Sequence, residues 1–166
     1  ECAQPCRKKY SLLDENGNYL IRNKHLLSLK DFNASKHLKK LCEIGVKSFK
    51  IEGRLKDETY IKTVVTKYRQ ELDKISKKTS SGKIITDFTP MLEKAFNRGF
   101  TDYFLEKRNH CYNFDTPKSL GEKLGKVKIV GKDYFELEKN VPLNPQDGLC
   151  FIDKDGLQGC LVNKTV

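Results

Sequence analysis

Two cysteines near the start of the chain have the residue type and the close spacing of a metal-binding loop. Cys2 and Cys6 are separated by three residues, one of which is Pro5. Thiolates on one loop can converge on a single metal centre, and ligation by cysteine alone suits iron–sulfur clusters. Zinc sites prefer two cysteines separated by two residues, so this spacing alone is a weak indication of a metal site.

Three of the remaining four cysteines have plausible packing roles, and nothing near the fourth, Cys111 beside His110, completes a zinc site. Cys42 shares one face of an expected helix with Leu38 and Leu41, where a buried structural cysteine is the default interpretation. Cys150 and Cys160 fall in a strand-rich segment, and we expect them to pack there. No signal peptide is visible, so we expect a reducing, cytoplasmic location with metal-bound or buried thiols rather than disulfides.

Three charged residues end an extended run, Val46–Ile51, and have the types needed for catalysis. Lys50 and Glu52 would share a face, because side chains alternate along a strand. If this run is a strand of a parallel barrel, its carboxyl end leads into an active-site loop, and the guanidinium of Arg54 can bind a phosphate or a carboxylate. We predict catalytic roles for Lys50, Glu52 and Arg54, with a structural ion pair as the alternative.

A second basic residue lies among aromatic side chains. Arg98 is close in sequence to Phe96, Phe100, Tyr103 and Phe104. Aromatic rings beside basic residues can stack on the bases of nucleic acid and neutralise its phosphates. The rings can equally form a small core under a long loop, so we predict ligand binding for Arg98 and packing for the aromatics.

The chain shows no nucleophile and base arranged as in a known peptidase motif. Neither a GxSxG nor an HExxH segment is present. His25 and His37 have no partner in a motif, and we expect His37 to face solvent on its helix. No cysteine–histidine spacing supports thiol catalysis.

Charge is distributed unevenly over the 166 residues. The net charge is +10, and residues 1–117 hold 24 Lys and Arg against 15 Asp and Glu, a net of +9. RNA is a natural partner for such a surface, although a lysine-rich solvated surface is the alternative. No apolar run approaches the roughly 20 residues that span a bilayer, so we expect no membrane partner.

The first half alternates extended and helical patterns. Residues 14–18 form a turn within an expected hairpin, and residues 26–29 resemble a short strand. Helices are expected over about 34–44, ended by Gly45, and over about 57–75. Together with residues 46–51, this order is βαβα, the unit of a parallel sheet.

The second half changes in character. Residues 76–83 resemble a linker, a short helix is possible over 87–96, and residues 97–117 are aromatic and irregular. Short strands follow at 126–130, 134–137, 149–152 and 161–166, as in most of a small antiparallel barrel. The chain starts Glu1-Cys2 without an initiator Met, so we expect it to be part of a longer protein.

Two segments carry a specific family resemblance. They are Cys2-Ala-Gln-Pro-Cys6-Arg7 and Gly45-Val-Lys-Ser-Phe-Lys50-Ile-Glu52-Gly53-Arg54. At this spacing the chain resembles peptidase family U32, the collagenase-like peptidases. Asn97-Arg98-Gly99-Phe100-Thr101 and Asp115-Thr-Pro-Lys-Ser119 extend the likeness to long members with a collagenase-type insert and a C-terminal β domain.

The resemblance implies an α/β fold: the C-terminal portion of a TIM-type barrel with two βα units, an irregular insert and a small antiparallel β-barrel-like domain. We expect these parts at 1–78, 79–119 and 120–166. It also implies an iron–sulfur cluster, with Cys2, Cys6 and Cys42 as candidate ligands and the remaining ligands upstream of Glu1. Arg7 and Arg98 are the candidate substrate-binding residues.

The resemblance leaves the reaction open. Some members look like enzymes that hydroxylate a pyrimidine in RNA, and the long members are similar to a ribosomal RNA cytidine hydroxylase. Others are called peptidases or collagenases, which would make a protein the substrate. We expect the intact enzyme to be an RNA hydroxylase and this chain alone to be inactive, as a binding or structural piece.

Overall fold

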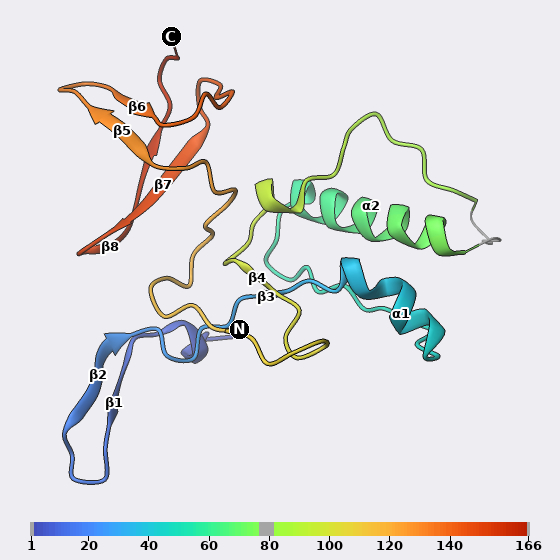
Figure 1. The fold of residues 1–166 in the computed structure, drawn as a ribbon, viewed down its shortest axis with the longest axis horizontal. Coiled ribbons are helices and arrows are strands. Elements are labelled where there is room, and N and C mark those ends of the chain that lie inside the picture. Colours follow the sequence, from blue (N-terminus) through green and yellow to red (C-terminus); the bar gives the residue numbers. More distant parts are fainter. Residues whose placement is uncertain (1, 77–81, 166) are drawn as a thin grey trace.

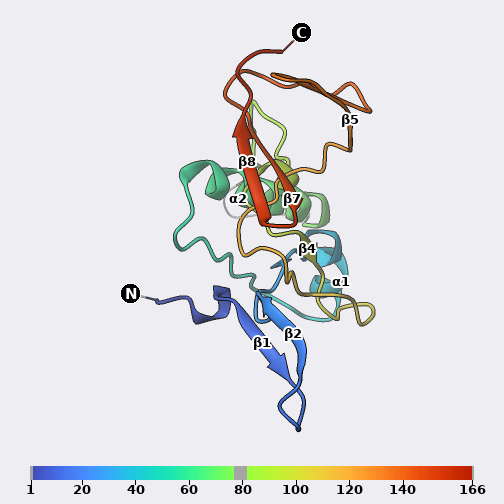
Figure 2. The same cartoon turned by 90° about the vertical axis from the view of Figure 1, so that its left-hand side faces the viewer.

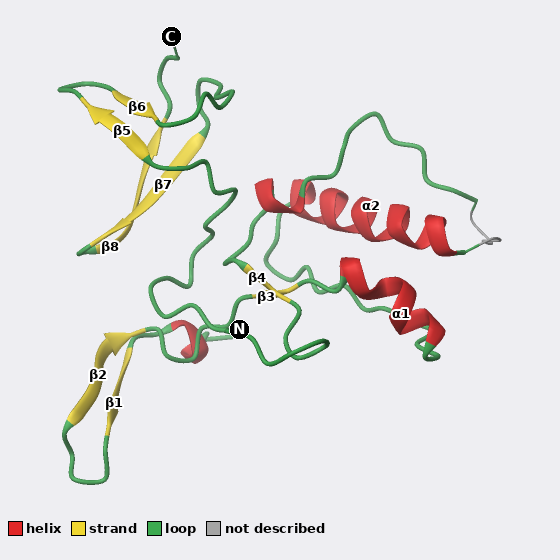
Figure 3. Ribbon diagram, in the orientation of Figure 1, coloured by secondary structure: helices red, strands yellow, loops and turns green. Residues whose placement is uncertain are grey.

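The computed structural model describes residues 2–76 and 82–165 (Figure 1). Its strands pair two by two in four separate ladders, and loops connect most of the elements (Figure 3). In chain order the elements are η1 (Pro5–Arg7), β1 (Tyr10–Leu13), β2 (Tyr19–Lys24), β3 (Asp31–Phe32), η2 (Ser35–His37), α1 (Leu38–Glu43), α2 (Glu58–Ile75), η3 (Leu92–Lys94), β4 (Phe100–Thr101), β5 (Val127–Val130), β6 (Phe135–Leu137), β7 (Gly148–Asp153) and β8 (Gly156–Leu161).

The predicted N-terminal hairpin is confirmed. β1 and β2 pair antiparallel, and the turn between them is organised by one carboxylate. The side chain of Asp14 accepts hydrogen bonds from the backbone N–H groups of Asn16 at 2.9 Å and Asn18 at 2.8 Å. Gly17 adopts a φ of 81°, which a side chain would disfavour. The hairpin lies at the bottom of the view in Figure 2 and β5 at the top, with the β7–β8 ladder between them.

The first predicted strand is displaced. Residues 26–29 form no strand: the N–H of Ser28 bonds to the carbonyl of His25 at 2.9 Å, and Leu29 forms one isolated bridge with Tyr112. The strand is β3, a few residues later, and it pairs parallel with β4. A strand is defined by its partner, and this partner lies in the segment that we predicted to be irregular.

Both predicted helices are present. η2 and α1 together cover the first, and it ends at Gly45, which has a φ of 102° and whose N–H bonds to the carbonyl of Cys42 at 3.1 Å. The second is α2, an 18-residue helix. Asp57 caps it by accepting a hydrogen bond from the N–H of Tyr60 at 2.7 Å.

Replacing Asp57 by alanine is expected to lower the free energy of unfolding by about 1 kcal/mol, because the N–H of Tyr60 loses its acceptor. Asp57→Asn keeps an oxygen at the cap and should lose much less. Urea unfolding followed by far-ultraviolet circular dichroism measures both variants. Equal losses for the two would show that the cap is not the cause.

The run Val46–Ile51 differs from its prediction. It forms no strand in the described part of the chain, where the backbone of residues 47–51 makes no ladder hydrogen bond. Extended backbone without a paired neighbour is not a strand. The described ladders do not close into a barrel, and the TIM-type architecture stays a prediction, as do the three domain ranges.

The C-terminal hairpins agree with the sequence pattern in part. β5 and β6 lie where strands were predicted, and β7 pairs with β8 across the turn ending at Gly156. The strand predicted at 161–166 lies earlier, because this short turn starts β8 directly at Gly156 and only Leu161 falls in the predicted range. Residues 162–165 form no strand, and residue 166 lies outside the described residues. The predicted helix 87–96 is only the single turn η3, since Pro90 disfavours helical backbone in the residue before it.

The buried apolar core of the described residues is small. It consists of four side chains: Ala34, Leu38, Leu92 and Val162. Large apolar side chains elsewhere are exposed, among them Ile85, Val130 and Leu55. None of the helices within residues 2–76 and 82–165 combines the length and the apolar character needed to cross a membrane.

Candidate functional site

A cavity of about 380 Å³ lies between β3, the extended segment at residues 48–52 and one side of α2. It is lined by aromatic rings together with a few polar groups that come from different parts of the chain. The lining residues are Asp31, Phe32, Asn33, Ala34, Ser48, Phe49, Lys50, Ile51, Glu52, Tyr60, Val64, Tyr68, Leu92, Ala95, Phe96 and Phe100. A mostly apolar hollow with a few convergent polar groups is typical of a ligand site.

Two of the three predicted catalytic residues line this cavity as an ion pair. The Nζ of Lys50 lies 3.0 Å from the Oε1 of Glu52. Their side chains are 86% and 73% exposed, so the pair contributes little to stability and both groups are available to a ligand. Arg54 is exposed and lies just beyond the cavity segment. Their catalytic roles stay predictions.

Two tyrosines of α2 contribute hydroxyl groups to the cavity. The hydroxyl of Tyr68 accepts a hydrogen bond from the N–H of Ala34 at 2.9 Å and lies 3.4 Å from the Oδ1 of Asn33. Burial raises the pKa of Tyr68. Burial and then the negative charge of Asp31 raise the pKa of Tyr60. Both stay protonated donors at neutral pH, a role that their place in an apolar helix stripe did not reveal.

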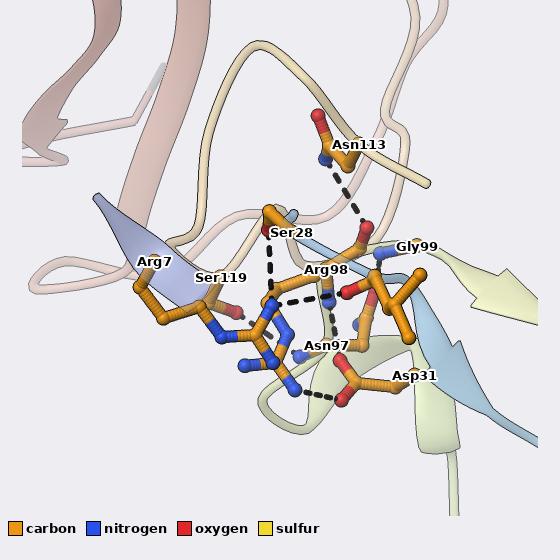
Figure 4. A network of polar contacts seen from close by, with 9 residues as sticks. Arg7, Ser28, Asp31, Asn97, Arg98, Gly99, Asn113 and Ser119 are labelled. Carbon is orange, nitrogen blue, oxygen red and sulfur yellow. Dashed lines mark hydrogen bonds and ion pairs between the residues drawn. The ribbon is translucent and has the colours of Figure 1, made fainter. Parts of the chain in front are cut away.

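Arg98 is held by Asp31 in a network at the start of β4 (Figure 4). Its guanidinium forms an ion pair with the Asp31 carboxylate, which also accepts a hydrogen bond from the backbone N–H of Arg98 at 2.7 Å. The nearly buried Asn97 donates to the carbonyls of Glu93 and Ala95. These contacts fix a charge that sequence analysis could place only in an irregular loop.

Arg7 reaches across to a different part of the chain. Its Nη1 donates to the Oγ of the buried Ser28 at 3.0 Å and to the carbonyl of Leu29 at 3.3 Å (Figure 4). The Nδ1 of His25 lies 2.8 Å from the carbonyl of Arg7. The loop that carries Cys2 and Cys6 is thereby tied to the turn that precedes β3.

The candidate metal ligands do not meet as one group. Cys2 and Cys6 are exposed free thiols, and Cys42 is a half-buried free thiol on α1. Within residues 2–76 and 82–165, no three His, Cys, Asp or Glu side chains are placed to share a metal ion. The thiols of Cys2 and Cys6 are exposed and can contribute to a metal site. Cys42 does not form a three-ligand group with them in the described residues. Cys150 and Cys160, which we expected to pack, are exposed.

Lys56 was not among the site residues predicted from the sequence. Its Nζ lies 3.2 Å from the centre of the Phe96 ring, and Phe96 lines the cavity. Lys56 comes two residues after Arg54, and the run of charged residues from Lys50 onward was the available indication. Lys56 lies close enough to Arg98, more than forty residues later in the chain, for the two charges to interact.

Comparison with known proteins gives the family. The sequence model of peptidase family U32 matches residues 1–114, which is well over half of the chain. The chain belongs to peptidase family U32. The resemblance carried by the Cys2–Arg7 and Gly45–Arg54 segments is therefore confirmed. No solved structure gives a significant match to this U32 chain.

Relatives of this U32 chain bear two kinds of name. The 23S rRNA 5-hydroxycytidine C2501 synthase of Escherichia coli (strain K12) is 41% identical over 98% of the chain and 26% of that relative. The tRNA hydroxylation protein P of the same organism is 32% identical over 91% of the chain and 35% of that relative. A collagenase of Porphyromonas gingivalis is 34% identical over 82% of the chain and 40% of that relative. The chain thus spans a quarter to two fifths of these relatives' length.

Proposed function

We propose that the intact enzyme containing this chain hydroxylates a cytidine in ribosomal RNA. The observation that carries the proposal is the 41% identity to the 23S rRNA 5-hydroxycytidine synthase, which extends over 98% of the chain. The excess of positive charge in residues 1–117 suits an RNA substrate. We place this activity in the cytoplasm, where ribosomal RNA is found, and expect this chain alone to be inactive.

The proposed cofactor is an iron–sulfur cluster held in part by Cys2 and Cys6. Both thiols are free and exposed on the loop that Arg7 anchors. Such a cluster, when bound, would supply electron transfer. Cys42 is the weaker candidate, because it is not grouped with the other two thiols among the described residues. The remaining ligands would come from outside this chain.

The cavity provides groups suited to a nucleotide. Aromatic rings such as Phe49 and Phe96 can stack on a base, and the Glu52 carboxylate can accept hydrogen bonds from the exocyclic amino group of cytosine. Lys50 and Arg54 are exposed cations at its edge and can neutralise phosphates. In this proposal Glu52 and the rings orient the base, and the cations hold the RNA backbone.

A peptidase is the alternative, favoured by the relatives that are named collagenases. The chain's histidines give it no support. His25 faces the carbonyl of Arg7, and His110 stacks on Tyr112 with ring centres 5.2 Å apart. The expectation that His37 faces solvent is wrong: its Nε2 lies 3.4 Å from the Oδ2 of Asp102. Its Nδ1 lies 3.6 Å from the Oε1 of Glu106, so both ring nitrogens of His37 face carboxylates and neither faces a nucleophile.

The proposal predicts that the intact enzyme, purified without oxygen, contains iron and restores 5-hydroxycytidine to ribosomal RNA in cells that lack it. Cys2→Ser and Cys6→Ser should lower the iron content and the modification together. Lys50→Gln should reduce modification at least about tenfold while leaving iron and stability unchanged, because the exposed pair contributes little to folding.

Lys39→Gln, an exposed lysine of α1, is the matched control and should modify RNA normally. Modification is measured by mass spectrometry of RNA digests, and iron by metal analysis. An enzyme that is free of iron and leaves RNA unmodified, yet degrades gelatin in a manner abolished by one substitution, would establish the peptidase alternative.

A further inference from the structure

Three cations from distant parts of the chain gather beside one carboxylate. They are Arg7 in η1, Lys56 before α2 and Arg98 before β4, and the carboxylate is Asp31 in β3. The Nζ of Lys56 and the Cζ of Arg98 lie 3.2 and 5.4 Å from the centre of the same Phe96 ring, and Arg98 pairs with Asp31. Figure 4 shows Arg7 beside this pair, and the charges of Arg98, Arg7 and Asp31 all act on Lys56. We call these four residues the basic cluster. It borders the cavity, which Asp31 and Phe96 line.

Lys56 has no ion-pair partner among the described residues, although the charges of Asp31 and Asp57 act on it. Burial, and then the charge of Arg98, lowers its pKa, so its cationic form is disfavoured by its surroundings. In the described residues no carboxylate forms an ion pair with it. Its nearest partner is the face of Phe96, 3.2 Å away, which attracts a cation more weakly than a carboxylate does.

The two arginines also have N–H groups that could donate to a bound anion. Arg7 bonds only to neutral oxygens, those of Ser28 and Leu29, within the described chain. Arg98 pairs with Asp31, but its buried Nε finds no acceptor among the described residues. A buried N–H without an acceptor is unfavourable, and a bound anion would satisfy it after a small movement of the side chain.

Three positive charges therefore meet two carboxylates, Asp31 and Asp57, which leaves the cluster with a net positive charge. Like charges held together cost free energy unless an anion neutralises them. Planar guanidinium groups bind the oxygens of phosphate in pairs, and a lysine adds a point charge. A tetrahedral oxyanion with several oxygens suits three cations that arrive from three separate segments.

We propose that Arg7, Lys56 and Arg98 form a binding site for a phosphate oxyanion, with Asp31 positioning Arg98. The phosphate would be a phosphodiester of the RNA strand or a free phosphorylated molecule. The RNA source rests on the proposed function, whereas the site itself does not. Placed beside the cavity, an RNA phosphate at the cluster would direct an adjoining nucleotide towards Lys50 and Glu52.

The test is a titration of the whole 166-residue chain with inorganic phosphate at constant ionic strength, followed by nuclear magnetic resonance of the arginine Nε–H groups. The signal of Arg98 should shift and saturate. Lys56→Gln should weaken binding about tenfold, because one charge-assisted contact is lost. Lys56→Arg keeps the charge and should bind like the original chain, and so should the surface control Lys39→Gln.

No shift of the Arg98 signal in the original chain would overturn the proposal, and so would equal binding by the Lys56→Gln and original chains. Circular dichroism establishes that each variant is folded. A short single-stranded RNA, added with phosphate present, then identifies the source. Competition between the two supports the phosphodiester, and saturable phosphate binding that RNA leaves unchanged supports a free phosphorylated molecule. Neither result depends on hydroxylation, so failure of the enzymatic proposal is seen separately.

Discussion

Replacing Leu38 by alanine is expected to lower the free energy of unfolding by about 3 to 4 kcal/mol. Leu38 begins α1 and is 1% exposed, the lowest value among the four buried apolar side chains. Removing its branched end leaves a cavity that neighbouring groups fill only in part. Because the core of the described chain is so small, few other buried contacts remain to compensate for the loss.

Urea unfolding followed by circular dichroism measures this effect. Ile85→Ala removes apolar atoms from a side chain that is 95% exposed, and it should change the free energy of unfolding by less than about 0.5 kcal/mol. If Leu38→Ala unfolded at the same urea concentration as Ile85→Ala, α1 would not be part of the cooperative core.

The second large effect is expected for Asp31→Asn. This change removes the charge that pairs with Arg98 and weakens the bond to the Arg98 backbone N–H. Breaking a buried pair from one side typically costs 3 to 5 kcal/mol; here the two side chains are about a fifth exposed, so we expect about 2 to 4 kcal/mol. The same contacts join β3 to β4, so the parallel pairing should weaken as well.

Asp115→Asn is the control for this prediction. Asp115 pairs with Lys24 at 2.8 Å, but the two side chains are 53% and 49% exposed. Solvent screens such a pair, and its loss should cost less than about 1 kcal/mol. Urea unfolding of both variants measures the loss of global stability. Hydrogen exchange at the Asn33 N–H, which bonds to the carbonyl of Thr101 in β4 at 2.8 Å, measures the local loss of β3–β4 pairing. Equal losses for Asp31 and Asp115 would contradict a special role for the Arg98 pair.

The parts of the fold that the sequence predicted are those stabilised by neighbours in the chain. Asp14 and Gly17 organise the hairpin turn within a few residues, and Asp57 caps α2 three residues away from its partner. Such local hydrogen bonds can be predicted from the types of residues that lie a few positions apart. Gly45 was recognised as the end of the first helix for the same reason.

The parts that were missed depend on distant partners. The pattern at Leu26–Leu29 resembles a strand, but pairing with Phe100 selects Asp31–Phe32 instead. The Val46–Ile51 run has the right composition and no ladder partner in the described residues. Strand prediction from sequence alternation fails in both cases, because the pattern shows that a segment could pair but does not identify its partner strand.

The candidate site also combines local contacts, which were predicted, with distant contacts, which were not. Lys50 and Glu52 were predicted together, and their contact at 3.0 Å arises from alternation along a short segment. That Arg98 lies against Asp31, and that Lys56 lies over Phe96, depends on folding across tens of residues. Family resemblance named Arg7 and Arg98 separately, but only the fold brings them together with Lys56.

The parallel pairing of β3 with β4 has a consequence for the order in which the chain folds. The β1–β2 hairpin and α2 can form early, since their contacts are local. β3 must wait for a partner almost seventy residues away, and closing so long a loop carries an entropic penalty. Arg98 can therefore meet Asp31 only after this long loop has closed, whereas the hairpin can form without that closure.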